Sequence, residues 1–465
     1  MKRQNVTFSI GNVALIDKAD AQTGFFKAVF EDIGGRAKDF IPQVKLLINN
    51  RLGHCLSINR LLEFSHPELL HILDFERSVS ERSIYRTIER LGENYPVIIR
   101  KYQRWIENQG LVDNEQFADF TSAYFEGVHC PLGKLGYSRD GQPGKQQLTV
   151  GISVGQNNIP TMLTIQKGNV QDKSHMKHMI KLCSLVFSEN TLLAFDCGGN
   201  TRENKQLIRD KNLNYLTLKA KQKTSYLKAI KFFETQKQIK VPVKEKEYLC
   251  VKMKSDGENE WQYIFFSSEL KKNQLKKKQN KFQKALEKGE LLQKKVKRGK
   301  DLGQQVCPDG WIITKGQIQK TIDEVKNPFI SGIEGFFILE SSIDEKPEYI
   351  LQLYKNRDKA EKFIRALKEG AELRPFRHWS KDAVIGSVLI VFLTNMLINL
   401  TLFLNKNSFI KNLKLLKKYS GNLTLSIFYP KNGFRMMVIS NYSDEMKALL
   451  GDFIRKYGDL ELQIW

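Results

Sequence analysis

Thr191-Leu-Leu-Ala-Phe-Asp196, followed by Cys197-Gly-Gly199, is the stretch on which the expected fold depends. A short apolar run that ends in an acid and meets two glycines is typical of a buried central strand. Such a strand presents its last side chain at the carboxyl edge of a sheet. We therefore predict a strand over 191–196 with the carboxylate of Asp196 at that edge.

Patterns on both sides of this stretch predict a mixed α/β sheet. Phe117-Ala-Asp-Phe-Thr121 is short, apolar and aromatic, which predicts a buried strand carrying Asp119. Gln147–Val154 and Ile159–Gln166 alternate around a polar turn and predict a hairpin. Two helices and a further strand are expected at about 174–187, 202–210 and 215–218.

Tyr354-Lys-Asn-Arg-Asp-Lys-Ala-Glu-Lys-Phe-Ile-Arg-Ala-Leu-Lys368 contains strong helix formers and no Gly or Pro, so we predict one continuous helix. At about 100° per residue, Arg357, Glu361 and Lys368 fall within roughly 40° of one another. Tyr354 lies only ~20° further round the same face. A solvated charged face with an Arg–Glu pair, worth only ~0.3–0.5 kcal/mol, is the alternative explanation.

Composition narrows the class of protein. The chain has 465 residues and a formal net charge of +23, which favours two or three domains and a polyanionic partner. Its six cysteines are scattered without a CxxC pair, as in a protein of a reducing cytosol. Ala383–Leu404 is largely apolar and long enough to cross a bilayer. It contains several polar residues, however, and the sequence has no second apolar segment of this length. We expect a buried core helix and a soluble protein.

Residues 1–110 are predicted to be helical and basic. Ser78 with Glu81 predicts a capping box, apolar residues follow at helical spacing, and Gly92 is expected to end the helix. Three arginines line the other side of this helix: Arg82, Arg86 and Arg90. With short helices before it, at 57–64 and 67–73, the segment suits a helix-turn-helix-like unit on DNA. An ordinary charged surface helix fits the pattern equally well.

Residues 220–335 interrupt the α/β order. β-like segments are expected at 248–253, 261–266 and 335–339. Between them, Ser268–Lys300 is predicted to be helical, with thirteen Lys and Arg against three Glu and a net charge of +10. Such a run is usually a solvated face or arm, but in so basic a chain nucleic-acid phosphates are a natural partner. From Leu423 on, one or two strands and a short helix at 443–457 are expected.

Three carboxylates stand out as candidate ligands: Asp119, Asp196 and Glu361. An ionised carboxylate on a buried strand is costly unless it is paired or binds a metal. Carboxylates from two strands and a helix can hold two divalent cations that activate a water or a DNA 3′-hydroxyl for phosphoryl transfer. Mg²⁺ suits these hard oxygen ligands, and Mn²⁺ can substitute. His175 and His178 lie on a predicted helix without a third ligand, so no zinc site is expected.

The sequence resembles the DDE transposases of prokaryotic insertion sequences, in the branch with a Y-(2)-R-(3)-E-(6)-K signature. That signature is complete here: Tyr354, Arg357, Glu361 and Lys368. Five further segments carry the resemblance: Asp119-Phe-Thr-Ser-Ala-Tyr-Phe-Glu126, Leu135-Gly-Tyr-Ser-Arg-Asp140, Gly168-Asn-Val-Gln-Asp172, Asp196-Cys-Gly-Gly-Asn-Thr-Arg-Glu-Asn204 and Leu373-Arg-Pro-Phe-Arg-His-Trp379. Within them Glu126, Asp140 and Asp172 have spacings that suit structural roles rather than metal binding.

The resemblance implies an α/β, ribonuclease-H-like mixed-sheet core that is interrupted by an insertion and preceded by a helical DNA-binding region. It implies catalytic and metal-binding roles for Asp119, Asp196 and Glu361. Phosphate contacts are implied for the other signature residues: Tyr354, Arg357 and Lys368. The expected parts are an N-terminal region (1–112), the first core segment (113–220), the insertion (221–335), the rest of the core (336–405) and a C-terminal region (406–465).

The implied activity is that of an insertion-sequence transposase, an endonuclease that uses Mg²⁺ to cleave element ends and joins them to target DNA. Its partners would be the terminal repeats and target DNA, not a membrane, with a homodimer holding two ends in the cytoplasm at the nucleoid. The arginines at 82, 86 and 90 are candidates for end binding by position and charge alone. Two alternatives stay open: a related nuclease that only hydrolyses, and a catalytically silent DNA-binding protein derived from a transposase.

Overall fold

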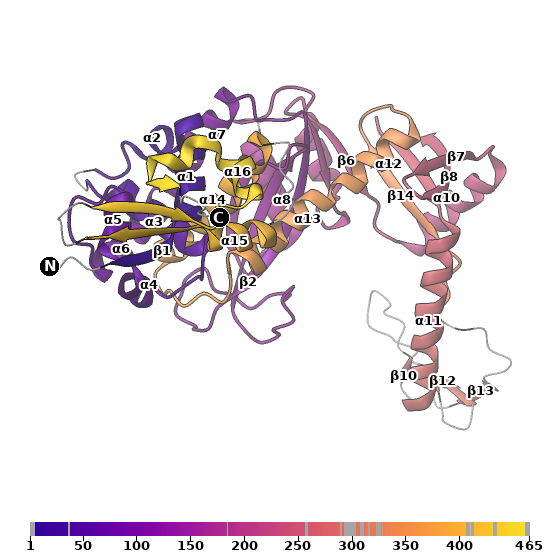
Figure 1. Cartoon of the computed structure of the whole chain (residues 1–465). Helices are drawn as coiled ribbons and strands as arrows, with labels where there is room; N and C mark the ends of the chain where they lie inside the picture. Colours follow the sequence, from indigo (N-terminus) through magenta and orange to yellow (C-terminus); the bar gives the residue numbers. More distant parts are fainter. Residues whose placement is uncertain are drawn as a thin grey trace, which may run out of the picture. The chain divides into compact units, whose positions relative to one another are not determined.

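The computed structural model describes residues 5–35, 38–183, 185–255, 259–288, 291–292, 304–306, 311–314, 317–321, 327, 329–405, 410, 413–430 and 435–460. The chain forms two compact units (Figure 1). Unit 1 contains Met1–Leu213 and Asn356–Trp465, and unit 2 contains Asn214–Lys355. The helical N-terminal region therefore belongs to the same compact unit as the strands that carry the candidate aspartates.

The central sheet of unit 1 has the strand order β4-β3-β2-β5. Its strands are β2 (Glu115–Tyr124), β3 (Gln147–Gly155), β4 (Pro160–Lys167) and β5 (Leu192–Phe195). β3 runs antiparallel to β2 and to β4, whereas β5 runs parallel to β2. The predicted fold class, α/β with a mixed sheet, is confirmed.

Helices cover both faces of this sheet. α8 (Asp172–Cys183) and α9 (Arg202–Arg209) flank β5 in the chain, and His175 of α8 packs on Phe120 of β2 with ring centroids 4.8 Å apart. Successive side chains of a strand point to opposite faces, so Asp119 points away from α8. α13 (Asp358–Arg365) packs against β2 and β3, and the residue before it, Arg357, contacts Asp119.

Residues 354–368 are helical as predicted, except at Arg357, but the winding is not uniform. The structure has three elements in this region: α12 (Pro347–Asn356), α13 and the π-helical segment η3 (Ala366–Gly370). Arg357 has φ −55° and ψ −23°, close to 3₁₀ geometry, and the amide of Ala371 donates to the carbonyl of Ala366 five residues back (3.1 Å). These changes of winding alter the direction of Lys368. No Gly or Pro within 354–368 marks them, although the π-helical segment itself ends at Gly370.

α14 (Lys381–Leu404) is the buried centre of unit 1. Its N-cap is Ser380, whose hydroxyl accepts a hydrogen bond from the amide of Ala383 at 3.0 Å. Of the described helices, α14 alone has the length and apolar composition to cross a membrane, and 94% of its most apolar window lies buried inside the protein. The prediction of a buried core helix is confirmed.

N-terminal helices surround α14. They are α1 (Gly11–Thr23), α2 (Phe25–Phe30), α3 (Phe40–Leu52), α4 (Ile58–Phe64), α5 (Pro67–Ile72), α6 (Glu81–Glu93) and α7 (Tyr95–Asn108). α6, α3, α1 and α7 pack directly on α14. The apolar face predicted for α6 is therefore the face that covers the core helix, and its buried members are Ile84, Ile88 and Leu91.

Two predictions for the ends of α6 are wrong. The capping box is formed by Ser80 and Ser83, because Glu81 is the first helical residue and cannot reach back as the third. Gly92 does not end the helix, which continues to Glu93 with Asn94 as its C-cap. A Cβ on Gly92 would lie 1.8 Å from the carbonyl oxygen of Asp382, so this glycine permits close contact with α14.

The two ends of the chain meet in a second sheet of unit 1, with the order β1-β15-β16-β17. Its elements and their neighbours are β1 (Val6–Ser9), α15 (Leu413–Asn422), β15 (Thr424–Phe428), β16 (Met436–Ser440), α16 (Asp444–Leu450), η4 (Gly451–Lys456) and β17 (Asp459–Leu460). Val6 of β1 pairs with Ile427 of β15, and the two strands are antiparallel. The predicted C-terminal elements are found, but β1 was not expected, since four residues are too few to show a period.

Unit 2 is built on an antiparallel set of strands in the order β6-β14-β9-β8-β7. Its elements are β6 (Asn214–Leu218), α10 (Lys223–Thr235), β7 (Ile239–Val243), β8 (Lys246–Lys254), β9 (Trp261–Phe266), α11 (Ser268–Lys288), β10 (Leu291–Leu292), β11 (Gln304–Val306), β12 (Trp311–Thr314), β13 (Gln317–Thr321), β14 (Phe336–Ser341) and α12. α10 packs on this sheet through Tyr226, Ile230 and Phe233. The basic helix ends at Lys288, not at Lys300, and residues 293–300 lie outside the described part.

The helix contact between α6 and α14 leads to a stability prediction. A Cβ on Gly386 of α14 would lie 1.9 Å from the carbonyl oxygen of Ile88, so Gly386→Ala must push the two helices apart. We expect it to lower the free energy of unfolding by ~1–3 kcal/mol. Gly421→Ala is the matched control, because a Cβ at this helical position meets nothing within 4 Å and should stabilise by up to ~1 kcal/mol. Urea unfolding of both variants measures the difference, and equal stabilities would contradict the close contact.

His175 leads to a prediction about pH. The side chain is buried between Thr149 and Thr164, whose hydroxyls lie 3.2 and 2.9 Å from the two ring nitrogens. Burial lowers its pKa to about 3, so folded protein keeps this ring neutral while unfolded chains take up a proton below pH ~6.5. Stability should therefore fall with decreasing pH, by up to ~3 kcal/mol between pH 6.5 and 4.5.

In His175→Gln this part of the pH dependence should disappear, whereas His129→Gln, at an exposed position, should behave like the native protein. Urea unfolding at several pH values from 6.5 to 4.5 makes the comparison. Identical slopes for native protein and His175→Gln would show that the buried ring does not act in this way.

Candidate active site

Two aspartates meet where β2 and β5 run side by side. The strands are parallel, with Phe117 opposite Ala194. Asp119 and Asp196 each follow that pair by two residues, so continuing the register puts them at the same level and on the same side of the sheet. Neighbouring strands lie ~4.8 Å apart. The strand register thus brings these two predicted site residues together.

The carboxyl group of Asp119 is largely buried. Desolvation is the main cause that raises its pKa, to about 6, and the nearby charges of Glu361 and Asp196 raise it further. The guanidinium of Arg357 and the backbone amide of Phe120 oppose this shift. The charges of Glu361, Asp196 and Arg357 therefore all act on the Asp119 carboxyl group.

Asp196 is oriented by the tight turn that follows it. Its Oδ1 accepts a hydrogen bond from the amide of Cys197 at 2.7 Å, at the start of η1 (Cys197–Gly199). A Cβ on Gly198 would lie 2.8 Å from the carboxylate of Asp172 on α8. The Cys-Gly-Gly sequence therefore lets the turn lie against α8 and leaves the Asp196 carboxylate at the strand end.

Glu361 and Arg357 lie on the face of the sheet that is opposite to α8, which is the face toward which Asp119 points. α13 buries Ala360, Phe363 and Ile364 and holds the Glu361 side chain at the boundary with solvent, 43% exposed. Arg357 Nη2 lies 2.5 Å from Glu361 Oε1, and Arg357 Nη1 lies 3.7 Å from Asp119 Oδ1. The guanidinium, only 15% exposed, therefore lies between the two carboxylates that come from β2 and from α13.

Lys368 contacts a carboxylate that the sequence did not suggest for it. Its Nζ lies 2.6 Å from Oδ1 of Asp140, which also accepts a hydrogen bond from Arg374. The Asp140 side chain is 1% exposed, and its Oδ2 is buried without a hydrogen-bond partner. Burial lowers the pKa of Lys368, while Asp140 opposes that shift. Lys368 is thus a member of a buried charge network.

The remaining predicted site residues lie elsewhere in the described structure. Tyr354 is in the last turn of α12, which belongs to unit 2. On α6, Arg82 and Arg86 are exposed, whereas Arg90 donates a hydrogen bond to the carbonyl of Gly34 at 2.5 Å. The structure brings together the two aspartates, Glu361 and Arg357, and it places the α6 arginines on a separate helix.

A metal ion would have to replace a guanidinium at this site. Among the described residues, no three His, Cys, Asp or Glu side chains lie close enough to form a metal cage. Around Asp119, the position between the carboxylates is taken by the positive charge of Arg357. The donor atoms themselves are hard carboxylate oxygens that suit Mg²⁺. They fit a divalent cation only after Arg357 moves aside.

Functional residues of two kinds were not predicted from the sequence. Arg374 completes the Asp140 network from a loop that follows η3, and no local pattern announces such a contact. Lys359, Lys362 and Arg365 lie on the part of α13 that faces a cavity beside α14. Their regular spacing of three residues is a signal that the sequence carries.

The fold and this site define an α/β protein whose mixed sheet presents paired aspartates beside a helix-borne glutamate. No protein-family model matches the sequence, and no curated protein matches it significantly. Among solved structures, the chain is similar to one described as piggyBac transposase in a synaptic complex with hairpin DNA, determined by cryo-EM. The TM-score is 0.45 at 10% identity, over 90% of this chain and 82% of the other. A likeness of this degree does not identify a function.

The Asp140 network gives a test of the role of Lys368. Lys368→Met leaves a buried carboxylate with Arg374 as its remaining cation, so we expect the free energy of unfolding to fall by ~2–4 kcal/mol. Lys362→Met is the control on the same segment, since its ion pair with Asp358 is exposed and should contribute under ~1 kcal/mol. Thermal and urea unfolding report the change. A Lys368→Met protein as stable as the control would show that the lysine is free for other partners.

Proposed function

We propose that this chain is an insertion-sequence transposase of the DDE type, which cleaves DNA at element ends and joins those ends to target DNA. The observation that carries the proposal is the level register of Asp119 and Asp196, with Glu361 tied to Asp119 through Arg357. Carboxylates from two adjacent strands and one helix suit phosphoryl transfer assisted by metal ions. The complete Tyr354, Arg357, Glu361, Lys368 signature supports the same proposal.

Mg²⁺ is the proposed cofactor, as two ions that Mn²⁺ can replace. Asp119, Asp196 and Glu361 would hold them. When bound, the ions would supply an activated water or 3′-hydroxyl and would neutralise charge on the leaving oxygen. Desolvation of Asp119 favours such binding, because a buried carboxylate is more stable beside a cation than alone.

Arg357 would exchange one anionic partner for another. In the structure its guanidinium neutralises Asp119 and Glu361. A guanidinium forms two parallel hydrogen bonds with a phosphate as readily as with a carboxylate. A DNA phosphate at the site would draw Arg357 away, and the released carboxylates would be available to metal ions. Asp196, held by the Cys197 amide, would keep its orientation throughout.

DNA is the proposed partner, as element terminal repeats and as target. The net charge of +23 and the exposed arginines of α6 support binding to a polyanion. The basic helix α11 adds cations in unit 2. A homodimer that holds two ends, in the cytoplasm at the nucleoid, belongs to the proposal.

The proposal predicts that joining depends on the carboxylates. The substrate is a labelled duplex that carries the DNA sequence flanking the gene and that has been pre-cleaved at the 3′ end of one strand. It is incubated with plasmid and Mg²⁺. Asp119→Asn and Glu361→Gln should each reduce joining by at least ~1000-fold, or ~4 kcal/mol of transition-state stabilisation. Asp358→Asn, on the exposed side of α13, is the control and should join like the native protein. Chelation of Mg²⁺ should stop the reaction.

Each other outcome has a definite meaning. Nicking of DNA without any joining would show that the protein is a hydrolytic nuclease and not a transposase. DNA binding with neither nicking nor joining would leave a silent DNA-binding protein. Joining that survives Glu361→Gln would overturn the assignment of that residue.

A further inference from the structure

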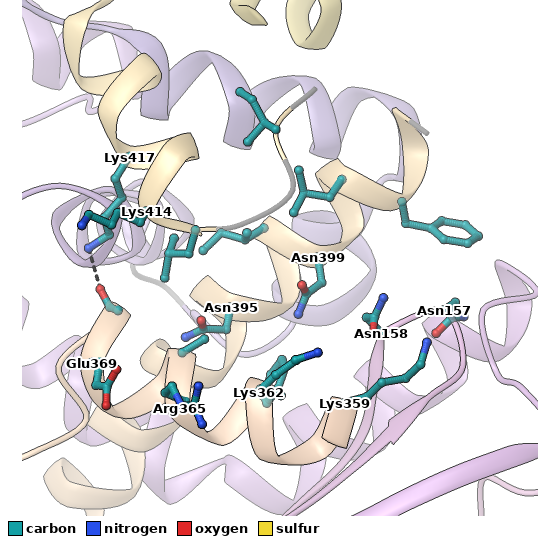
Figure 2. Close-up of a pocket in the computed structure, with 18 of the residues that line it drawn as sticks. Asn157, Asn158, Lys359, Lys362, Arg365, Glu369, Asn395, Asn399, Lys414 and Lys417 are labelled. Atoms are coloured by element: carbon teal, nitrogen blue, oxygen red, sulfur yellow. Dashed lines mark hydrogen bonds between the residues drawn. The ribbon is translucent and has the colours of Figure 1, made fainter. Parts of the chain in front are cut away.

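A cavity with several cationic side chains in its lining lies beside α13. It has a volume of about 1160 Å³, and its walls come from α13 and η3, from α14, from α15 and from the turn between β3 and β4 (Figure 2). In Figure 2, side chains from these elements point into a common space, with Lys359, Lys362 and Arg365 on one side and Asn395 and Asn399 on the other. The cavity lies wholly within unit 1.

Cations dominate the charged residues of its lining. These are Lys359, Lys362, Arg365, Lys414 and Lys417, against the one carboxylate of Glu369 among the described lining residues. Two of the cations are bound to the protein. Lys359 donates to the carbonyl of Gln156, and Lys417 donates to the carbonyls of Gly370 (2.5 Å) and Arg51 (3.0 Å). They fix the cavity wall.

The other cations are available to a ligand. In the described part of the chain, Arg365 and Lys414 have no carboxylate within ion-pair distance, and Lys362 has only its exposed pair with Asp358. Lys362 and Arg365 are three residues apart on α13, ~4.5 Å along the helix axis at 1.5 Å per residue. Their long side chains can therefore reach two neighbouring phosphates of one strand.

The rest of the lining suits bases rather than a bare anion. Leu402 provides apolar surface, and Asn399 and Asn158 provide amide groups. The Asn157 side chain also lines the cavity, but its amide is bonded to the carbonyl of Leu111 at 2.7 Å. Asn395 is also part of the wall, but its amide is bonded to the carbonyl of Val391 at 2.9 Å. An apolar surface with side-chain amides, bordered by cations, is the chemistry that single-stranded nucleic acid needs for its bases and its backbone.

We infer that this cavity binds a single DNA strand, with phosphates on Lys362, Arg365 and Lys414 and a base against Leu402 and Asn399. A duplex is too wide to enter a space of this volume, whereas one or two unpaired nucleotides fit. The inference rests on the proposed function for its choice of DNA. The cavity would bind the unpaired strand that forms when a DNA end is opened. The described residues of its lining do not include the candidate catalytic residues Asp119, Asp196 and Glu361.

The test uses the full chain in EDTA, so that no cleavage is needed, and a fluorescent oligothymidylate of twelve nucleotides. Lys362→Ala/Arg365→Ala should weaken binding by at least tenfold. It should also reduce the slope of log affinity against log salt by ~1.4, for two lost phosphate contacts. Lys27→Ala/Arg455→Ala removes the same charge from exposed positions on other elements and should change affinity less than threefold.

Asn399→Trp fills the cavity without a change of charge. It should weaken oligothymidylate binding about fivefold while the salt slope stays as in the native protein. A labelled duplex of twelve base pairs should bind all these variants as tightly as it binds the native chain. Glu361→Gln should bind oligothymidylate as tightly as the native protein. The binding assay therefore tests the cavity independently of the joining assay, which tests the proposed function.

Equal losses in the two double variants would overturn the inference, because affinity would then follow net charge alone. Unchanged binding by Asn399→Trp, or a parallel loss for the duplex, would overturn it as well. Selective loss of single-strand binding in both cavity variants would establish the site, whatever the outcome of the joining assay.

Discussion

The burial of α14 is the constraint on which unit 1 depends. A helix that is apolar on all sides has to be covered on all sides, and no single neighbouring segment is long enough to do so. Helices from the first hundred residues supply the cover, with Gly92 and Gly386 allowing α6 and α14 to touch through their backbones. The N-terminal region is therefore built into the same unit as the sheet, and its arginines are carried on a helix whose other face is fixed in the core.

A second consequence concerns the site. α13 packs on β2 and β3 through Ala360, Phe363 and Ile364, which fixes the side of the helix that carries Glu361. Arg357, at the start of that helix, then lies between Glu361 and Asp119. Like charges from β2, β5 and α13 are tolerated in one place because a cation accompanies them. The same residues that suit a metal site are thus stable without one, provided that Arg357 remains.

Much of this could be predicted from local sequence. Asp119 and Asp196 were placed on their strands because apolar runs of strand length surround them, and the hairpin of β3 and β4 followed from its alternation. Lys368 could not be placed. Its direction depends on the π-helical turn at 366–370, and its partner Asp140 is distant in sequence. The cap of α6 was shifted by two residues because several serines compete for one position.

The sequence by itself determined the core strands that place Asp119 and Asp196, the hairpin of β3 and β4 and the burial of α14, since these depend on hydrophobic period and composition. Only the tertiary structure decided which charges meet. Register sets Asp119 level with Asp196, packing brings Arg357 between Asp119 and Glu361, and the fold of α13 against α14 and α15 opens a basic cavity. Contacts between residues far apart in the chain depend on three-dimensional packing, because no local pattern encodes the partner of a charge.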